Sequence, residues 1–309
     1  MQNNILDVKG LFVGQAENTE GKTGVTVVII PNGAVCGVDV RGAAPGTRET
    51  DLLDPVNAME RVNAVVLSGG SAFGLEAASG VMQYLEEKNL GFDVGCTTVP
   101  IVPQAVLFDL SYGDYRCRPD KKMGYQACEN ATDKTLQEGS VGAGCGATVG
   151  KLYDMQRCCK SGIGSFAQTL ENGITVGALI AVNAFGDVLE NGKIIAGTTN
   201  AEKTAFINTE KTMLQMASAP SFHGKNTTIG IIATNAKLTK AEAKKIAAMA
   251  HDGLARAIRP IHTTLDGDTL FCLSTGEMES QAPVVDLIGT LAAKVTEQAV
   301  IAAVKKAKP

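Results

Sequence analysis

The sequence predicts an α/β protein. Apolar strand-like runs alternate along the chain with amphipathic stretches of helical period. The 34 glycines and the aromatic content of only 5% suit tight turns between strands and helices and close packing of small residues. With 309 residues, 45% of them hydrophobic, the chain can bury a large core, so we expect a globular protein.

The first half of the chain has four strand-like runs, at residues 25–30, 35–40, 63–70 and 99–110. Ser71 follows the third run, and we expect it to cap a helix that ends near Lys88. Apolar residues recur along one side of this helix, at Phe73, Leu75, Ala78, Val81, Met82 and Leu85. A more polar helix is expected over 124–137, before a glycine-dense loop at 139–150.

The second half begins with a predicted β-hairpin, formed by 162–170 and 175–188. Residues 191–226 lack strong periodicity, and we expect a long, partly mobile excursion there, which usually has a functional reason. The remaining expected elements are a strand at 228–236, a helix at 240–258, a strand at 268–276 and a final helix at about 283–306. The helix at 240–258 opens with a capping box, Thr239 to Glu242, and Pro260 stops it.

Charge and composition exclude several classes of protein. The formal charge is −4 and no run of Lys or Arg lines a helix face, so we expect no nucleic-acid partner. The N-terminus has no long apolar segment, and we expect neither a signal peptide nor a membrane span. The eight cysteines form no CxxC pair, and the three histidines are not spaced for zinc. We therefore expect reduced thiols in a cytoplasmic protein without a metal.

Two glycine-rich runs fail the motifs that they approach. GGSAFG at 69–74 has no glycine two places after Ser71, so it does not match the nucleophile elbow G-x-S-x-G. VGAGCGATVG has Ala147 where the third glycine of G-x-G-x-x-G belongs. Both runs are better interpreted as places where backbones pack closely.

The most informative junction is Asn226-Thr227-Thr228, where a polar, turn-rich approach meets an apolar strand. A threonine hydroxyl is a weak nucleophile unless a base takes its proton, and the residue's own α-amine can do so once the preceding peptide bond is cut. An α-amine titrates near pH ~7.7–8.0, so a useful fraction is free at neutral pH. The other interpretation is that Asn favours the turn and Thr simply begins a strand.

Eight blocks of the sequence carry a resemblance to a known family. In order they are RGAAPGTRETDLLDP, NAVVLSGGSAFGLEAASGVMQYLEE, VPIVPQAVLFDL, GSVGAGCGATVGK, KSGIGSFAQ, TVGALIAVNAFGD, NTTIGIIATNA and AHDGLARAIRPIHTTLDGDTLFCLSTGE. They resemble the DmpA-type aminopeptidases, a group that includes β-peptidyl aminopeptidases, L-aminopeptidase/D-esterases and nylon-oligomer hydrolases. The likeness runs from about residue 10 to the C-terminus.

The resemblance implies a four-layer αββα sandwich of the DmpA/ornithine-acetyltransferase type, formed by a single domain over 1–309. It also implies that the chain cuts itself between Asn226 and Thr227, giving an α chain (1–226) and a β chain (227–309). Thr227 stands where the family has its nucleophile. The aminopeptidase branch more often has Ser at this place, and Thr after Asn is closer to the nylon-oligomer hydrolases.

Other catalytic residues follow from the resemblance one at a time. Asp266 and Asp268 match a carboxylate pair of the nylon-hydrolase branch, although Asp-Gly is also a common turn before a strand. Two carboxylates at i and i+2 of an extended backbone point the same way and can share a proton. Asn183 matches the family's oxyanion-hole asparagine. Lys160 is the first choice for the family's active-site lysine, and Lys151 is the alternative.

The resemblance implies an N-terminal-nucleophile amide hydrolase, an aminopeptidase or a small-amide or oligomer hydrolase, that works through an acyl-enzyme on Thr227. Neither metal nor organic cofactor is required, and homo-oligomers, often tetramers, are usual for the family. The substrate is expected to be a small peptide or amide, with 99–117 contributing to specificity. Two alternatives remain: an acyltransferase related to ornithine acetyltransferase, and a non-catalytic, unprocessed binding protein on the same scaffold.

Overall fold

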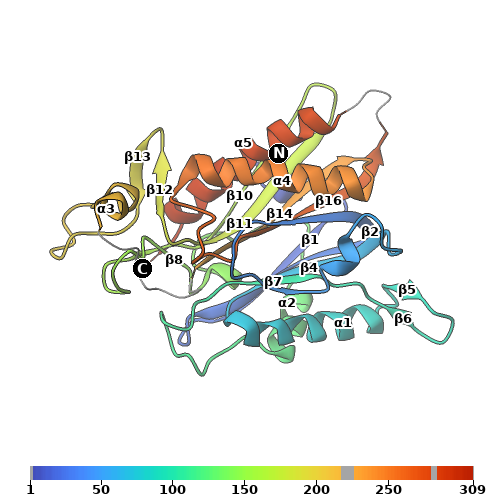
Figure 1. Ribbon diagram of the computed structural model, residues 1–309. Coiled ribbons are helices and arrows are strands. Elements are labelled where there is room, and N and C mark those ends of the chain that lie inside the picture. The colour runs from blue at the N-terminus through green and yellow to red at the C-terminus, as the bar shows by residue number, and fades with distance from the viewer. Residues whose placement is uncertain (1–2, 217–225, 280–283, 309) are drawn as a thin grey trace.

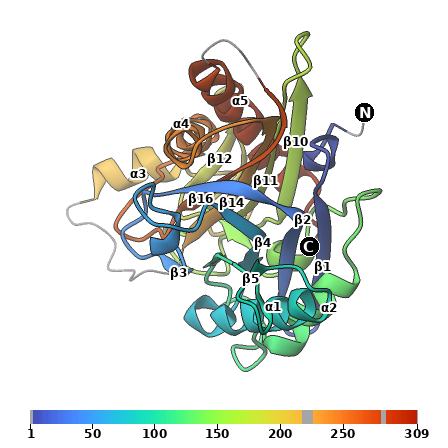
Figure 2. The same cartoon turned by 90° about the vertical axis from the view of Figure 1, so that its right-hand side faces the viewer.

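The computed structural model describes residues 3–216, 226–279 and 284–308. Within these ranges the protein has four layers: two helices, two β layers and two further helices (Figure 1). Figure 2 shows the same order from the side, with α4 and α5 over one face of the strands and α1 and α2 under the other. The predicted αββα sandwich is confirmed.

A mixed nine-stranded sheet supplies both β layers. The layer next to α4 and α5 contains β10 (Ile163–Thr169), β11 (Thr175–Asn183), β14 (Thr227–Ala236) and β16 (Thr269–Met278). The other layer contains β1 (Phe12–Asn18), β4 (Arg61–Ser68), β7 (Gln104–Val106) and β3 (Gly46–Arg48). β2 (Thr23–Val40) joins the two layers, because residues 23–29 pair with β1 and residues 35–40 pair with β16.

β2 corrects the prediction of two separate strands at 25–30 and 35–40. The chain continues as one strand of 18 residues through Pro31-Asn32-Gly33, a sequence that predicts a turn. The turn signal is still visible, because the register of β2 against β4 shifts between Ile29 and Ala34. Gly33 lies there with φ +68°, a backbone conformation that favours glycine. The irregularity lies where β2 passes from one layer to the other.

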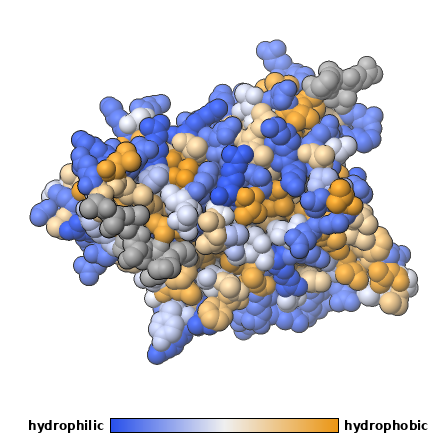
Figure 3. Space-filling model, viewed as in Figure 1, coloured by the Kyte–Doolittle hydropathy of each residue, from blue (hydrophilic) through white to orange (hydrophobic). Residues whose placement is uncertain are grey.

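The four long helices cover the outer faces of the sheet: α1 (Ala77–Glu87), α2 (Lys121–Glu129), α4 (Lys240–Ala257) and α5 (Val285–Lys305). Three apolar cores hold the layers together. One lies between α4, α5 and the first β layer, one between the two β layers, and one under α1 and α2. On the face shown in Figure 3, hydrophobic residues lie in separate patches among hydrophilic ones.

α5 is long and apolar enough, by length and composition, to cross a membrane. However, 61% of its most apolar window is buried inside the protein. The helix packs along α4, β10 and β11. Buried apolar surface of this kind is what a core helix of a globular protein shows, so we interpret α5 as a core helix.

Several helix and strand boundaries differ from the prediction. The helix predicted after Ser71 begins as the 3-10 helix η3 (Ser71–Glu76), in which Gly70 and not Ser71 holds the N-cap position. The polar helix expected at 124–137 is α2, because the side chain of Asp120 accepts from the N–H of Met123 and starts it earlier. The capping box of α4 forms as predicted. The strand expected at 99–110 is reduced to β7, which follows Pro103.

The excursion at 191–226 contains regular structure. Next to it, β12 (Asp187–Glu190) pairs with β13 (Lys193–Ala196) and with β15 (Ile258–Arg259). The short helix α3 (Thr209–Gln215) follows, and the buried carboxylate of Asp187 accepts from its first N–H, that of Thr209, at 2.6 Å. These elements project at one side of Figure 1. Residues 217–225 of the predicted mobile segment lie outside the described residues.

The remaining short elements connect the layers. They are η1 (Ile5–Asp7), η2 (Asp51–Leu53), η4 (Gly142–Gly144), the strand pair β5 (Phe92–Asp93) and β6 (Thr98–Val99), and the strand pair β8 (Thr148–Val149) and β9 (Cys159–Lys160). The glycine-dense loop predicted at 139–150 contains η4 and β8. η4 packs against β1 and β2, and β8 packs against β11.

Candidate active site

Four of the predicted site residues, Asn183, Thr227, Asp266 and Asp268, meet at one end of β11, β14 and β16. Asn183, the last residue of β11, is the direct partner of Thr227, the first residue of β14. Opposed residues of antiparallel strands place their side chains on the same face. β16 runs parallel to β14, so the loop that carries Asp266 and Asp268 lies alongside Thr227. All four of these residues are buried, with at most 4% of their surface exposed.

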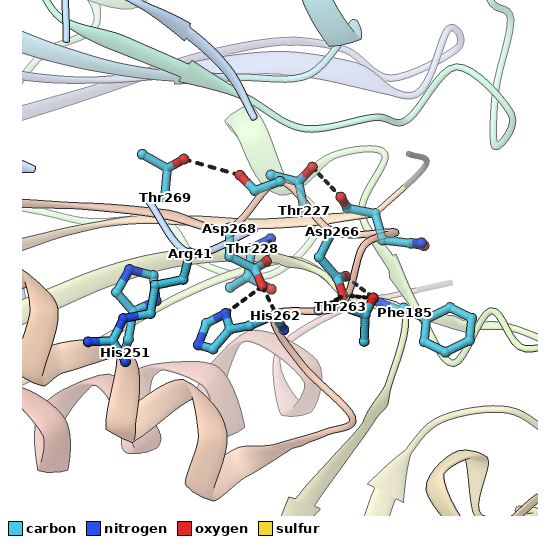
Figure 4. A network of polar contacts seen from close by, with 12 residues as sticks. Arg41, Phe185, Thr227, Thr228, His251, His262, Thr263, Asp266, Asp268 and Thr269 are labelled. Carbon is cyan, nitrogen blue, oxygen red and sulfur yellow. Dashed lines mark hydrogen bonds and ion pairs between the residues drawn. The ribbon is translucent and has the colours of Figure 1, made fainter. Parts of the chain in front are cut away.

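The Asn226–Thr227 peptide lies in the middle of this group. The Thr227 hydroxyl donates to the carbonyl oxygen of Asn226, as Figure 4 shows. The N–H of Gly267 donates to the same oxygen at 2.9 Å. A Cβ on Gly267 would lie 2.4 Å from the Ala44 carbonyl oxygen and 3.0 Å from Thr227 Oγ, so only glycine fits there. The hydroxyl therefore contacts the carbonyl group before it, whose oxygen already has a backbone donor.

Asp268 is held by donors on both carboxylate oxygens. Oδ1 accepts from the N–H of Thr228 at 2.7 Å. Oδ2 accepts from the backbone N–H of His262 at 3.2 Å and from its ring Nδ1 at 2.8 Å. Asp268 thus fixes the residue directly after Thr227, and Figure 4 shows His262 on the other side of the carboxylate.

Asp266 has mainly neutral donors. Its Oδ2 accepts from the N–H of Thr263 at 3.0 Å and from the Thr263 hydroxyl at 2.5 Å, and its Oδ1 accepts weakly from the N–H of Phe185 at 3.4 Å. Burial, and next the negative charge of Asp268, raise the pKa of Asp266 to about 6. Asp266 therefore retains a proton in mildly acidic solution.

We expect Asp266→Asn to stabilise the protein at pH 7. A carboxyl with a raised folded pKa is favourable to folding below its unfolded pKa and loses that contribution as the pH rises through about 4 to 6. The neutral amide has no such loss, so the free energy of unfolding at pH 7 should rise by about 1–3 kcal/mol. Urea unfolding at pH 7 and pH 4 measures the effect. A gain that is equal at both pH values would contradict the raised pKa of Asp266.

Asn183 is fully buried and uses both ends of its amide. Its Oδ1 accepts from the N–H of Thr148 at 3.1 Å and from Lys151 Nζ at 2.6 Å. Its Nδ2 donates to the carbonyl oxygen of Phe108 at 2.8 Å. These contacts fix the orientation of the amide with Nδ2 toward Phe108, a residue of the pocket described below. One of the two N–H bonds of Nδ2 serves that carbonyl.

Lys151 is the lysine that contacts Asn183. Its Nζ also donates to the main-chain oxygen of Asn183, at 2.9 Å, and the side chain is only 8% exposed. Burial lowers the pKa of Lys151 to about 7, against the opposing attraction of nearby Cys158, Asp266 and Asp109. An amine with this pKa is partly unprotonated at neutral pH, so it can accept a proton as well as donate one.

Lys160 binds elsewhere. Its Nζ donates to the carbonyl oxygens of Gly144 (3.1 Å), Ala147 (2.9 Å) and Ser161, all in or next to the glycine-rich loop. Burial lowers the pKa of Lys160 to about 8, but all three ammonium protons are used by these carbonyl groups. The geometry therefore favours Lys151, the alternative, over Lys160 as the site lysine.

A small pocket opens next to Lys151 and Asn226. It is lined by Phe108, Asp109, Ser111, Tyr112, Thr148, Lys151, Tyr153, Asp154, Met155 and Asn226. Four of these residues belong to the segment 99–117 that was expected to contribute to specificity. The pocket has a volume of about 70 Å³ and combines aromatic walls with two carboxylates. In the described part of the chain, no group of three His, Cys, Asp or Glu is placed to hold a metal.

Sequence reasoning missed His262, Thr263 and Gly267, which all lie within the block IHTTLDGD. The spacing of the histidines bears only on a zinc site, whereas the ring of His262 binds the carboxylate of Asp268. A usable signal was present: Thr263 lies three residues before Asp266, a spacing at which a hydroxyl often caps a turn carboxylate. For Lys151 the sequence holds no local signal, because its partner Asn183 is 32 residues away and is reached only through the fold.

Comparison with known protein families shows which family the chain belongs to. The model of peptidase family S58 matches residues 3–309. A protein of Mycobacterium leprae named as an uncharacterized aminopeptidase is 45% identical over 298 residues, which cover 91% of this chain and 80% of the relative. A 6-aminohexanoate-oligomer endohydrolase of a Kocuria species is 33% identical over 279 residues, which cover 88% of this chain and 75% of that enzyme.

Solved structures agree on the fold. An L-aminopeptidase D-Ala-esterase/amidase from Ochrobactrum anthropi, described as a variant of the Ntn-hydrolase fold, superimposes with a TM-score of 0.75 at 19% identity, covering 99% of this chain and 87% of that one. A β-aminopeptidase from a Burkholderia species gives 0.71 at 19% identity, covering 98% and 86%. The resemblance read from the sequence is thereby confirmed, and the chain belongs to peptidase family S58.

Proposed function

We propose that this member of a peptidase family is an amide hydrolase that activates itself by cutting the Asn226–Thr227 bond and then uses Thr227 as an N-terminal nucleophile. The observation that carries the proposal is the contact of the Thr227 hydroxyl with the Asn226 carbonyl group, whose oxygen also accepts the N–H of Gly267. A hydroxyl, an adjacent carbonyl group and a backbone donor are the parts that an N-to-O acyl shift needs.

In the first step, Thr227 Oγ bonds to the carbonyl carbon of Asn226, and the bond from that carbon to the Thr227 nitrogen breaks. The hydroxyl proton is delivered to the nitrogen, which becomes a free amine. Water then splits the ester and leaves Asn226 with a carboxylate. The Gly267 N–H stabilises the charge that develops on the carbonyl oxygen. In the best-studied case an oxyanion-hole donor lowers the activation free energy by about 2.7–4 kcal/mol.

Another group must move the first proton, because Thr227 has no free amine before the cut. Two buried groups next to this region exchange protons near neutral pH: Lys151, with a pKa lowered to about 7 by burial, and Asp266, with a pKa raised to about 6 by burial and by Asp268. Groups with such pKa values are suited to acid and base roles at pH 7.

In the second stage the new Thr227 amine takes the proton of its own hydroxyl, and the oxygen attacks a substrate amide. The leaving amine departs with that proton, and water then releases the acyl group from Thr227. Asn183, opposite Thr227 on the neighbouring strand, is the candidate donor to the oxyanion. The small pocket must open for this stage, and cleavage would free Asn226 from its wall.

The pocket favours a small peptide or amide with a free amino end. Phe108, Tyr112 and Tyr153 offer apolar contacts, while Asp109 and Asp154 bring negative charge to the same walls. A substrate ammonium group would be attracted by those carboxylates. The name aminopeptidase of one relative agrees with a free amino end, and the name 6-aminohexanoate-oligomer endohydrolase of another agrees with an amide substrate.

Denaturing mass spectrometry of the purified chain tests the proposal. After incubation at neutral pH we expect two fragments, one that ends at Asn226 and one that starts at Thr227. The cleaved protein should then release amine from amino-acid p-nitroanilides or short amide oligomers. An intact chain of 32.1 kDa after long incubation would count against self-cleavage. Transfer of the acyl group to added amines faster than to water would instead indicate an acyltransferase.

A further inference from the structure

His262 makes an unusual double contact with the buried carboxylate of Asp268. Its backbone N–H and its ring Nδ1 both reach Oδ2, at 3.2 and 2.8 Å. To do so the residue has φ +57°, in the left-handed region that most non-glycine residues avoid. His262 lies in the segment between β15 and β16, and its side chain is 18% exposed. The backbone strain is therefore used to aim two donors at one oxygen.

The donors around the two carboxyls are unequal. Asp268 accepts from the N–H of Thr228 at 2.7 Å, from the backbone N–H of His262 and from its ring Nδ1 at 2.8 Å. Asp266 accepts from the N–H and the hydroxyl of Thr263 on one oxygen, and its other oxygen has only the 3.4 Å contact with the N–H of Phe185. Two carboxyls that share one proton place it on the member whose anion is less stabilised. The contact with the imidazole ring thus distinguishes the carboxyl of Asp268 from the carboxyl of Asp266.

We propose that His262 is a positioning residue for this pair: through Nδ1 it keeps the negative charge on Asp268 and leaves the shared proton to Asp266. The inference rests on the proposed function, because it gives the pair two different duties in self-cleavage. The anionic Asp268 holds the N–H of Thr228 and so fixes the strand at the nucleophile. The protonated Asp266, whose residue is bridged to Asn226, is the member that can exchange a proton.

His251 supports the ring of His262 from α4. The two rings meet edge to face, with centroids 4.8 Å apart and planes at 69°. His251 is fully buried, and burial lowers its pKa to about 4, so it stays neutral at pH 7. Beyond it, Asp39 accepts from Arg41 at 2.8 Å and its carboxylate lies 3.6 Å from His251 Nε2. The charged or titratable groups on both sides of His262 are therefore Asp266, Asp268, His251, Asp39 and Arg41.

Two substitutions of His262 distinguish the effect of its Nδ1 donor from the effect of ring packing. His262→Ala removes the ring and its N–H. His262→Asn keeps an N–H donor close to the position of Nδ1, and asparagine tolerates positive φ better than other side chains do. For each variant we would measure the rate of self-cleavage between residues 226 and 227 and the kcat of the cleaved enzyme, both from pH 4.5 to 8.5. The thermal midpoint of unfolding shows whether the variant is folded.

We expect His262→Ala to move the acid limb of both profiles to higher pH by about one unit, because the pair takes up its second proton more easily without the imidazole. At pH values below the limb the rates should fall by about tenfold, which is the same shift expressed as a rate. His262→Asn should restore the limb to within a few tenths of a unit. A structural role alone would lower the thermal midpoint and leave the limb where it is.

The outcomes separate the two proposals. Failure of the wild-type chain to cut at 226–227 refutes the proposed function and, with it, this inference. A wild-type chain that is cut and active, together with an unmoved acid limb in His262→Ala, overturns only the role of His262. The same holds if His262→Asn, folded by its thermal midpoint, shifts the limb as far as His262→Ala does. His262→Gln, whose amide extends beyond Nδ1, serves as a second folded comparison if the Ala variant does not fold.

Discussion

Thr227→Ala should remain a single chain and should hydrolyse no amide. The substitution removes the oxygen that contacts the Asn226 carbonyl group, so neither the acyl shift nor the later acyl-enzyme can form. Loss of a nucleophile in hydrolases of this general type lowers turnover by at least about 10³-fold and leaves only binding and oxyanion stabilisation. The measurement is denaturing mass spectrometry over several days, followed by an amide hydrolysis assay.

Thr227→Ser is the matched control, because it keeps the hydroxyl and removes only a methyl group. Both cleavage and hydrolysis should persist in it, with rates within about tenfold of the wild type, since one methyl group is worth about 1 kcal/mol. Thr227 is 4% exposed, so the thermal midpoints of both variants report whether the strand start is still packed. Fragments that end at Asn226 in a folded Thr227→Ala chain would contradict the assignment of the nucleophile.

The outline of the fold was accessible from sequence because its signals are local. The box from Thr239 to Glu242 marks the start of α4 in a few adjacent residues, and the hairpin of β10 and β11 has strand patterns on both sides of a turn. The length of β2 was not accessible. Pro31-Asn32-Gly33 has the composition of a turn, but pairing with β1 on one side and β16 on the other keeps the chain extended through it.

The same distinction explains the site. Thr227, Asp266 and Asp268 could be predicted as candidates because each lies in a short block with its own signature, and the fold brings those blocks together at one end of β14 and β16. The sequence does not decide between the two lysines, since Lys151 and Lys160 are both preceded or followed by glycine-rich segments of similar composition. Only the contact of Lys151 with Asn183 distinguishes them, and that contact depends on how β8 packs against β11.

That contact leads to the second large effect: Lys151→Met should slow both self-cleavage and turnover by about 10²–10⁴-fold, the range for loss of a positioned acid or base. Met retains the length and apolar stem of the lysine while removing Nζ. Two hydrogen bonds to Asn183 disappear, one of 2.6 Å to its side-chain Oδ1 and one of 2.9 Å to its main-chain oxygen, so the amide is held less firmly. Single-turnover cleavage and steady-state hydrolysis measure the two rates.

Lys160→Met is the matched variant, and the comparison decides between the two lysines. Removal of Nζ of Lys160 takes one donor from each of three carbonyl oxygens, those of Gly144 and Ala147 in the glycine-rich loop and that of Ser161, so stability should fall by about 1–3 kcal/mol. The rate of the folded protein should change far less than in Lys151→Met, because Asn183 keeps its cation. If Lys160→Met instead loses activity while Lys151→Met keeps it, the lysine nearest to the chemistry is Lys160, and the contact between Lys151 and Asn183 serves only packing.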